Sequence, residues 1–278
     1  MKFVSFIRAD GTHGYGQLNG ESIIDISAAA GAPADLKAAI ADGSLSSLSS
    51  GPTLALEEVN LLPVIPNPEK ILCVGLNYES HRIETGRAEA AHPAIFVRFA
   101  DTLIAHGDPI TCPKVSSDLD YEAELAVIIS KQGRNISEDD ALDYVAGYAC
   151  FNDVSVRDWQ KHNIQFTPGK NFPGTGPFGP YMISPDEAGD LADVHVISRL
   201  NGQVMQDQPI REMLFSVPKL IAYISTFTPL NPGDVIATGT PGGVGAKRNP
   251  PVWMQPGDVI EIDVGPVGKL VNRIEREG

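Results

Sequence analysis

The chain has 278 residues and a formal net charge of −14, with 35 acidic against 21 basic residues. So negative a chain is a poor partner for nucleic acid or an anionic membrane, and we expect neither. The sequence lacks a run of the ~18 apolar residues that span a bilayer. Its three cysteines, without a Cys-x-x-Cys pair, favour a reducing compartment. We therefore expect a soluble, cytoplasmic protein with room for a large domain and a small one.

Residues 1–66 are predicted to form a small N-terminal α+β domain. Short strands are predicted at 3–7, 14–18 and 22–26, where Asp-Gly and Asn-Gly pairs supply turns, and a helix is predicted at 34–41. No candidate catalytic residue occurs in this part. A proline-rich linker follows, since proline interrupts both helices and strand ladders. We place the boundary there, with a second domain at 67–278.

The second domain opens with a strand at 71–74, followed by a segment that holds His81 and Glu84. If this segment is helical, a spacing of three residues puts both side chains on one face. A carboxylate beside an imidazole raises the basicity of the histidine, so the pair could deprotonate water. The alternative, a surface His-Glu pair without a role, is more common.

A strand at 120–129 begins with three acids and ends as an apolar, β-branched run. Because side chains alternate along a strand, Glu122 and Glu124 share a face about 7 Å apart, and the opposite face belongs to the core. Two like charges side by side favour a cation, and carboxylate oxygens favour Mg²⁺, Mn²⁺ or Ca²⁺ over zinc. The alternative is a solvated strand end without a metal.

A third acid, Asp153, is expected to converge on the two glutamates. Apolar residues between 137 and 148 are spaced as on a helix, and a short strand follows it. Ser155 is a candidate N-cap for the next helix, which places Asp153 at a strand-to-helix turn. The turn after it carries Arg157 and Gln160.

Two later loops carry further candidates. Lys170 lies in a segment rich in glycine and proline, where a lysine is usually solvated. Thr240 lies in a glycine-rich stretch at 238–243, whose backbone N–H groups could approach an anion closely; a plain turn is the alternative. Most elements after residue 70 are predicted to be strands, which favours a β-rich roll or barrel over a doubly wound parallel sheet.

Five stretches, in order, resemble the fumarylacetoacetate hydrolase family, from about Lys70 to the C-terminus. They are Val-Gly-Leu-Asn-Tyr-Glu-Ser-His-Arg-Ile-Glu (74–84), Asp-Tyr-Glu-Ala-Glu-Leu-Ala-Val-Ile-Ile (120–129), Gly-Tyr…Asn-Asp-Val-Ser-Val-Arg-Asp-Trp-Gln (147–160), Gly-Lys-Asn-Phe (169–172) and Gly-Asp-Val-Ile-Ala-Thr-Gly-Thr-Pro (233–241). The resemblance implies a β-rich α+β fold, a mixed β-sandwich roll that often forms homodimers. Asn171 is a departure, because the family more often has serine after this lysine.

The resemblance also implies roles for the candidates. The metal, Mg²⁺ or Mn²⁺ with Ca²⁺ possible, would be held by Glu122, Glu124 and Asp153. His81 and Glu84 match a dyad that activates water on a lid, and Lys170 matches a lysine that holds a substrate oxygen. The substrate's oxygens would be positioned by Arg157, Gln160 and Thr240.

The predicted function is metal-dependent hydrolysis of a C–C bond in a 2,4-diketo acid, an acylpyruvate or diketo-deoxy sugar acid, giving pyruvate and a carboxylic acid. In the alternative no water attacks, and the same enolate chemistry decarboxylates oxaloacetate or isomerises a hydroxymuconate-type diacid. A binding protein without turnover is disfavoured because His81, Glu84 and Lys170 are all present. The expected partners are a small anionic keto acid and a second copy of the chain.

Overall fold

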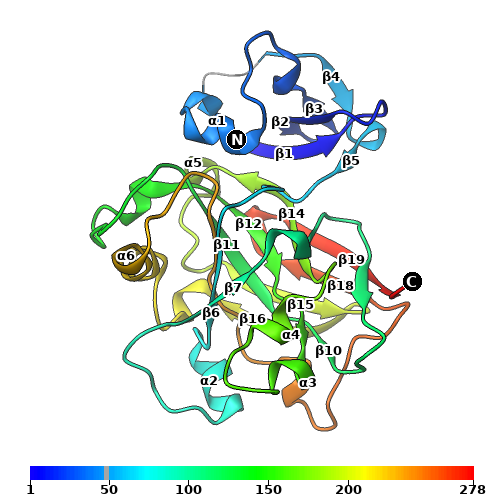
Figure 1. Cartoon of the computed structure of the whole chain (residues 1–278), viewed down its shortest axis with the longest axis vertical. Coiled ribbons are helices and arrows are strands. Elements are labelled where there is room, and N and C mark those ends of the chain that lie inside the picture. The colour runs from blue at the N-terminus through cyan, green and yellow to red at the C-terminus, as the bar shows by residue number, and fades with distance from the viewer. Residues whose placement is uncertain (47–49) are drawn as a thin grey trace.

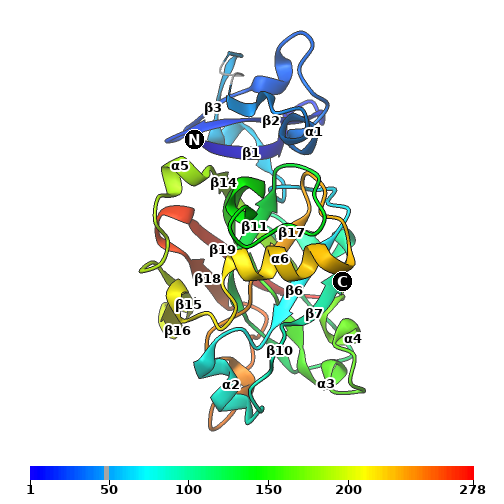
Figure 2. The ribbon, with the colours of Figure 1, turned by 90° about the vertical axis from the view of Figure 1, so that its left-hand side faces the viewer.

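The structure is a computed structural model that describes residues 1–46 and 50–278. Its first part forms a small unit at one end of the molecule, the blue unit of Figures 1 and 2. Asp35 begins the helix of this unit by accepting a hydrogen bond from the Ala38 N–H. The elements are β1 (Lys2–Ile7), β2 (His13–Asn19), β3 (Ser22–Ile24), α1 (Leu36–Ala41), β4 (Thr53–Ala55) and β5 (Asn60–Leu61).

One long sheet runs from this unit through the rest of the molecule, in the order β4-β3-β2-β1-β14-β12-β11-β17-β6-β7. The sheet is mixed, because β17 pairs with β6 in parallel while the other neighbours along this path are antiparallel. β5 and β8 pair off this path. Its further strands are β6 (Ile71–Gly75), β7 (Ala94–Arg98), β8 (Leu103–Ile104), β11 (Ala123–Ile129), β12 (Val145–Asn152), β14 (Gly176–Ile183) and β17 (Val235–Ala237).

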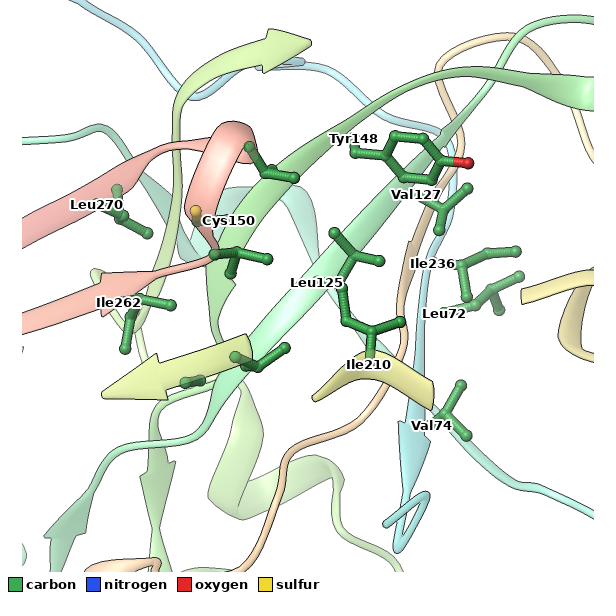
Figure 3. Packing of buried hydrophobic residues seen from close by; sticks show 14 of the residues in the cluster. Leu72, Val74, Leu125, Val127, Tyr148, Cys150, Ile210, Ile236, Ile262 and Leu270 are labelled. Atoms are coloured by element: carbon green, nitrogen blue, oxygen red, sulfur yellow. The ribbon is translucent and has the colours of Figure 1, made fainter. Parts of the chain in front are cut away.

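A second sheet covers one face of the first. It has the order β16-β15-β18-β19-β9, and a separate pair joins β10 to β13. Figure 3 shows apolar side chains between the layers, among them Leu125 from β11 with Ile262 and Leu270 from the covering sheet. The bounds are β9 (Ile110–Cys112), β10 (Leu119–Asp120), β13 (Ser155–Val156), β15 (His195–Leu200), β16 (Gln203–Pro209), β18 (Val259–Asp263) and β19 (Lys269–Arg276).

This architecture confirms the predicted β-rich α+β fold of mixed sheets. Within residues 1–46 and 50–278 both strand orders have free ends, so the sheets form an open roll rather than a closed barrel. β11 is buried on both faces, and its alternate residues serve two cores. Leu125 and Val127 pack toward the covering sheet, while Ala126 and Ile128 join a cluster that reaches the N-terminal unit.

Helices are few and short. α6 (Val217–Phe227) buries Leu220, Ile221 and Ile224 on one stripe. The others are α2 (Glu79–Thr85), α3 (Arg157–Gln160), α4 (Thr167–Lys170) and α5 (Pro185–Ala188). Single 3₁₀ turns are η1 (Ile26–Ala28), η2 (Ser44–Ser46), η3 (Leu56–Glu58), η4 (Ala100–Thr102), η5 (Ala141–Tyr144), η6 (Ile210–Glu212), η7 (Gly245–Lys247) and η8 (Gly265–Val267). None of the helices in the described ranges has the length and apolar character that crossing a bilayer requires.

Two predictions about the middle of the chain were wrong. The helix expected at 137–148 is only the turn η5, and the residues after it belong to β12. Ser155 does not cap a helix, since it lies in β13 and its hydroxyl donates to the carbonyl oxygen of Asp153. Pairing of β12 with both β11 and β14 outweighs the local helical spacing.

Candidate active site

Three buried carboxylates meet where β11 begins and β12 ends. The register pairs Ala123 with Asn152, so Asp153 lies beside Glu122, and its N–H donates to the Glu122 carbonyl oxygen (2.9 Å). One carboxylate oxygen from each of Glu122, Glu124 and Asp153 lies within 4.8 Å of the others. The antiparallel ladder therefore brings together the three acids that the sequence singled out.

Neighbouring positive charges stabilise the ionised form of Glu122 more than that of Glu124. Although burial opposes ionisation, the charges of Lys170 and Arg157 hold the pKa of Glu122 at about 2. Burial, with the nearby charges of Asp153 and Glu122, raises the pKa of Glu124 well above its usual range. Three hard oxygen donors with one uncompensated charge fit a divalent cation such as Mg²⁺, Mn²⁺ or Ca²⁺.

Lys170 is buried among these acids rather than solvated, with only 1% of its surface exposed. Its Nζ lies 2.7 Å from Glu122 Oε2 and 2.6 Å from Asp153 Oδ2. Burial opposes its charge, but the two carboxylates outweigh that effect and raise its pKa. α4 packs closely enough against α3 to place the lysine among the acids because residue 169 is a glycine. A Cβ added to Gly169 would lie 2.4 Å from the Cβ of Gln160.

Arg157 links this cluster to a buried aspartate. Its Nε donates to Asp120 Oδ2 (2.8 Å), and its Nη2 forms an ion pair with Glu122 Oε1 (2.7 Å). Its Nη1 donates to Gln160 Oε1 (2.9 Å), so the two predicted substrate-binding residues already contact each other. Asp120 also accepts hydrogen bonds from the N–H groups of Gly245 and Ala246, which fixes the loop that ends in η7.

His81 and Glu84 form a hydrogen-bonded pair on α2. His81 is buried, and its Nδ1 lies 2.7 Å from Glu84 Oε1. The other oxygen of Glu84 accepts the Gly243 N–H (2.8 Å), and the Gly242 N–H donates to the Ser80 hydroxyl (3.0 Å). α2 is therefore closed onto the glycine-rich loop, which orients the pair.

Thr240 is buried in the same loop, but its hydroxyl already has protein partners. It donates to the Ala123 carbonyl oxygen (2.8 Å) and accepts from Gln206 Nε2 (2.7 Å). The Gly239 N–H donates to Glu124 Oε2 (2.8 Å). The loop thus approaches an anion as expected, although this anion is a carboxylate of the protein.

Sequence reasoning missed three buried residues that support the site. Arg98 donates from Nη1 to Asp153 Oδ1 (2.7 Å) and from Nη2 to the Thr175 hydroxyl (2.8 Å). Gln206 holds Thr240, and Asp120 holds Arg157. A charged residue ending the apolar strand β7 was a usable signal for Arg98, because an unpaired charge is rarely buried.

One cavity of about 550 Å³ collects most of the candidates. It is lined by His81, Glu122, Glu124, Arg157, Gln160, Lys170 and Thr240, and also by the exposed residues Arg87, Lys161 and Lys247. Glu84 and Asp153 are each one hydrogen bond away, through His81 and Lys170. A proton-transfer pair, fixed cations and a potential metal site thus surround one space, an arrangement typical of an enzyme.

Residues 70–275 match the family described as "Fumarylacetoacetate (FAA) hydrolase C-terminal". The chain belongs to the fumarylacetoacetate hydrolase family, and it is an enzyme of that family. It is 42% identical over 223 residues to a mitochondrial oxaloacetate tautomerase of Xenopus laevis, covering 80% of this chain and 70% of that protein. It is 43% identical over 225 residues to an oxaloacetate tautomerase of Bacillus subtilis, covering 79% and 74%.

Solved structures agree with this assignment. A fumarylacetoacetate hydrolase from Exiguobacterium antarcticum superposes with a TM-score of 0.88 at 35% identity, over 100% of both chains. A putative HpcE protein from Mycobacterium smegmatis gives a TM-score of 0.91 at 30% identity, again over 100% of both chains. A 2-hydroxyhepta-2,4-diene-1,7-dioate isomerase from Mycobacterium marinum gives 0.81 at 28%, over 100% of this chain and 99% of that one.

Proposed function

We propose that this enzyme interconverts the keto and enol forms of oxaloacetate or a closely related 2-oxo diacid. The observation that carries the proposal is the His81–Glu84 pair on the wall of the cavity that also holds Lys170. Relatives at about 40% identity that are oxaloacetate tautomerases support it. They favour the alternative in which no water attacks over the hydrolysis predicted from the sequence.

The proposed reaction moves one proton and loses no atom. His81 Nε2, which has no protein partner among the described residues, takes a proton from C3 of the keto acid. The Glu84 carboxylate on Nδ1 stabilises the imidazolium that forms. The C–H electron pair forms the C2=C3 bond, and the carbonyl π pair moves to the 2-oxo oxygen. The His81 imidazolium then returns the proton to that oxygen, directly or through a water molecule, which restores the neutral histidine and completes the enol.

Fixed positive charge stabilises the oxyanion between these two steps. Lys170 lies where the cavity meets the carboxylates, and Arg157 and Gln160 are placed to orient the substrate's first carboxylate. A divalent cation held by Glu122, Glu124 and Asp153 would add Lewis-acid stabilisation of the enolate. Because these charges are oriented before substrate arrives, they cost little reorganisation.

The test is the rate at which enol oxaloacetate relaxes to the keto form, followed by ultraviolet absorbance with Mg²⁺ present. We expect His81→Ala to lower kcat by 10²-fold or more while the Kd for a non-reacting 2-oxo diacid stays within about threefold. His13→Ala, which changes an exposed histidine of the N-terminal unit, is the matched control. A native enzyme that does not accelerate the relaxation would contradict the proposal.

Hydrolysis of a 2,4-diketo acid remains the second candidate, because the same His81–Glu84 pair could activate a water molecule. Release of pyruvate, coupled to lactate dehydrogenase, separates the two reactions. Pyruvate and a carboxylic acid formed from an acylpyruvate, and lost on chelation, would favour the hydrolase. Pyruvate formed from oxaloacetate alone would instead indicate decarboxylation.

We also propose a homodimer. The edge strand β7 exposes Val97, and the following Phe99 is 53% exposed beside a groove lined by Trp159 and Phe172. A second copy of the chain would bury this apolar surface. Light scattering tests it: we expect a dimer mass for the native chain and a monomer for Phe99→Asp.

The cytoplasmic location also stays a prediction.

A further inference from the structure

We propose that Arg87, Lys161 and Lys247 form an outer anion subsite, which binds the distal carboxylate of a 2-oxo diacid substrate. The inference rests on the proposed function and deepens it. In this arrangement Arg157 and Lys170 serve the oxo-acid end of the substrate, and the outer subsite recognises the far end. The substrate class is therefore a 2-oxo acid with a second carboxylate, rather than one with an apolar acyl chain.

The residues that line the cavity carry an excess of positive charge, opposite in sign to the net charge of the molecule. The chain carries a formal net charge of −14, yet the cavity lining within residues 1–46 and 50–278 holds five lysines and arginines and two acids, Glu122 and Glu124. This reversal is local, so it attracts an anion to this place and not to the protein as a whole.

The side chains of the outer cations make no polar contact with the described residues of the protein. Lys170 and Arg157 form ion pairs with buried carboxylates. Most of the other lysines and arginines in the described part of the chain contact an acid, a carbonyl oxygen or an aromatic ring. Among the described residues, no hydrogen bond or ion pair involves the side chains of Arg87, Lys161 or Lys247, and all three are exposed. Three unpartnered cations around one cavity are available to a ligand.

The fold brings these cations from three separate elements. Arg87 follows α2, where Gly86 adopts a φ of 68° and the Arg82 guanidinium donates to the Arg87 carbonyl oxygen. Lys161 is the C-cap of α3, and Lys247 ends η7. Their backbones are therefore held by local structure while the charged ends stay free.

Asp120 couples the inner and outer parts of the cavity. It accepts from Arg157 Nε on one side, and from the N–H groups of Gly245 and Ala246 on the other. Lys247 directly follows these two residues, so one buried carboxylate sets the position of an inner cation and of the loop that carries an outer one. The cavity of about 550 Å³ also exceeds what the oxo-acid end alone would fill.

The experiment compares two ligands that differ only at the far end, 2-oxoglutarate and 2-oxopentanoate. Calorimetry with the Mg²⁺-loaded enzyme at 0.15 M salt gives the Kd of each. We expect the diacid to bind the native enzyme at least 10-fold more tightly, because hydrogen bonds to charged groups are stronger than those between neutral groups. The triple variant Arg87→Gln, Lys161→Gln, Lys247→Gln should abolish this difference and leave the Kd of 2-oxopentanoate unchanged.

Two further variants make the result specific. Lys219→Gln removes an exposed lysine of α6 that does not belong to the described lining of the cavity, and it should leave both Kd values unchanged. Lys247→Arg keeps the charge and should keep most of the preference for the diacid. Thermal unfolding of each variant checks that it folds, which we expect since the replaced side chains are exposed.

The proposal is overturned if the triple variant still prefers the diacid, or if it binds both ligands more weakly by the same factor. It is also overturned if 0.5 M salt removes the preference completely, because long-range attraction without contact is screened at that ionic strength. Binding needs no turnover. An enzyme that prefers diacids through these residues but does not accelerate enol relaxation would therefore refute the proposed reaction and keep the subsite.

Discussion

Glu124 is the carboxyl group whose charge the folded protein stabilises least. Burial and the charges of Asp153 and Glu122 raise its pKa well above the ordinary value near 4.5. The folded chain therefore holds a proton that the unfolded chain releases, so stability falls as the pH rises above the unfolded pKa. At neutral pH without a cation, this residue works against folding.

Glu124→Gln should therefore stabilise the metal-free protein. In EDTA at pH 7.5 we expect an increase of about 1–2 kcal/mol, which corresponds to a Tm higher by roughly 2–8 °C for a chain of this size. The amide oxygen can still accept the Gly239 N–H. Calorimetry with and without Mg²⁺ is the measurement, and Mg²⁺ should raise the Tm of the native protein only.

The matched control is Glu275→Gln, which changes an exposed glutamate on β19. It should leave the Tm unchanged both with and without Mg²⁺. A Glu124→Gln protein that is less stable than the native one in EDTA would show that the carboxylate is not repelled by its neighbours. Our description of the metal site would then be wrong.

Asp25 in the N-terminal unit has the opposite effect on the pH dependence of stability. Burial raises its pKa, but hydrogen bonds from Arg8 (Nε to Oδ2, 2.8 Å) and Ser27 outweigh that effect, so the net shift is downward. A lowered carboxyl pKa contributes stability that is present above the unfolded pKa near 3.8 and lost as the pH falls through the folded pKa.

Asp25→Asn should consequently cost about 2 kcal/mol at pH 7, because it weakens the charged hydrogen bonds that the half-buried Arg8 makes to this side chain. The difference in Tm between native and variant should narrow as the pH is lowered from 5 toward 3. Thermal melts across this range test it, with the exposed Asp101→Asn as control. A difference that stays constant with pH would mean that the charge of Asp25 contributes nothing.

At the scale of elements, the contact between α2 and the glycine-rich loop orients the catalytic pair. Gly243 has a φ of +107°, and a Cβ there would lie 2.2 Å from the Met205 carbonyl oxygen. Gly243→Ala should therefore shift the loop, misplace the N–H that holds Glu84 and lower kcat by about 10-fold or more.

Gly257→Ala separates this effect from backbone strain. Gly257 has a similar φ of +99° but open space around its Cβ position. It should cost only the roughly 1–2 kcal/mol of a left-handed conformation and leave kcat unchanged. Steady-state rates and melting temperatures of both variants test this, and equal kcat values would rule out the orienting role of the loop.

Some of these elements could be predicted from local pattern and others could not. Alternating apolar residues in β11 and the apolar stripe of α6 follow from periodicity, which decides the buried face. The first residues of β12, up to Tyr148, were assigned to the predicted helix because their pairing partners lie outside the local window, whereas the short strand predicted to follow corresponds to the rest of β12. Periodicity within a short segment cannot report pairing with distant strands.

The supporting residues of the site were hidden for the same reason. Arg98 meets Asp153 across 55 residues, and Asp120 meets Gly245 across 125. Such partners come together only through sheet register. The resemblance to a family located Lys170, whereas composition alone indicated a solvated lysine, and burial came from its position among the acids.

At the scale of the whole molecule, the N-terminal unit shares its core with the rest of the chain. β1 pairs with β14 and continues the long sheet, and Phe3 belongs to the cluster that includes Phe178. Phe6 instead belongs to a small cluster whose buried members, Val4, Phe6 and Ile23, all come from the N-terminal unit, and Tyr181 of β14 packs against it. The sequence predicted a separate domain at 1–66, but a shared core favours joint unfolding.

We therefore expect a single calorimetric unfolding transition, which both Phe3→Ala and Phe6→Ala shift to lower temperature. Each removes a buried aromatic side chain and should cost about 3–5 kcal/mol, equivalent to roughly 6–20 °C in a chain of this length. If the unit were independent, Phe6→Ala would instead lower a small first transition and leave a larger one, and the activity, unchanged. That outcome would make residues 1–66 a domain in their own right. Loss of activity in step with the single transition would show that the catalytic sheet depends on its N-terminal strands.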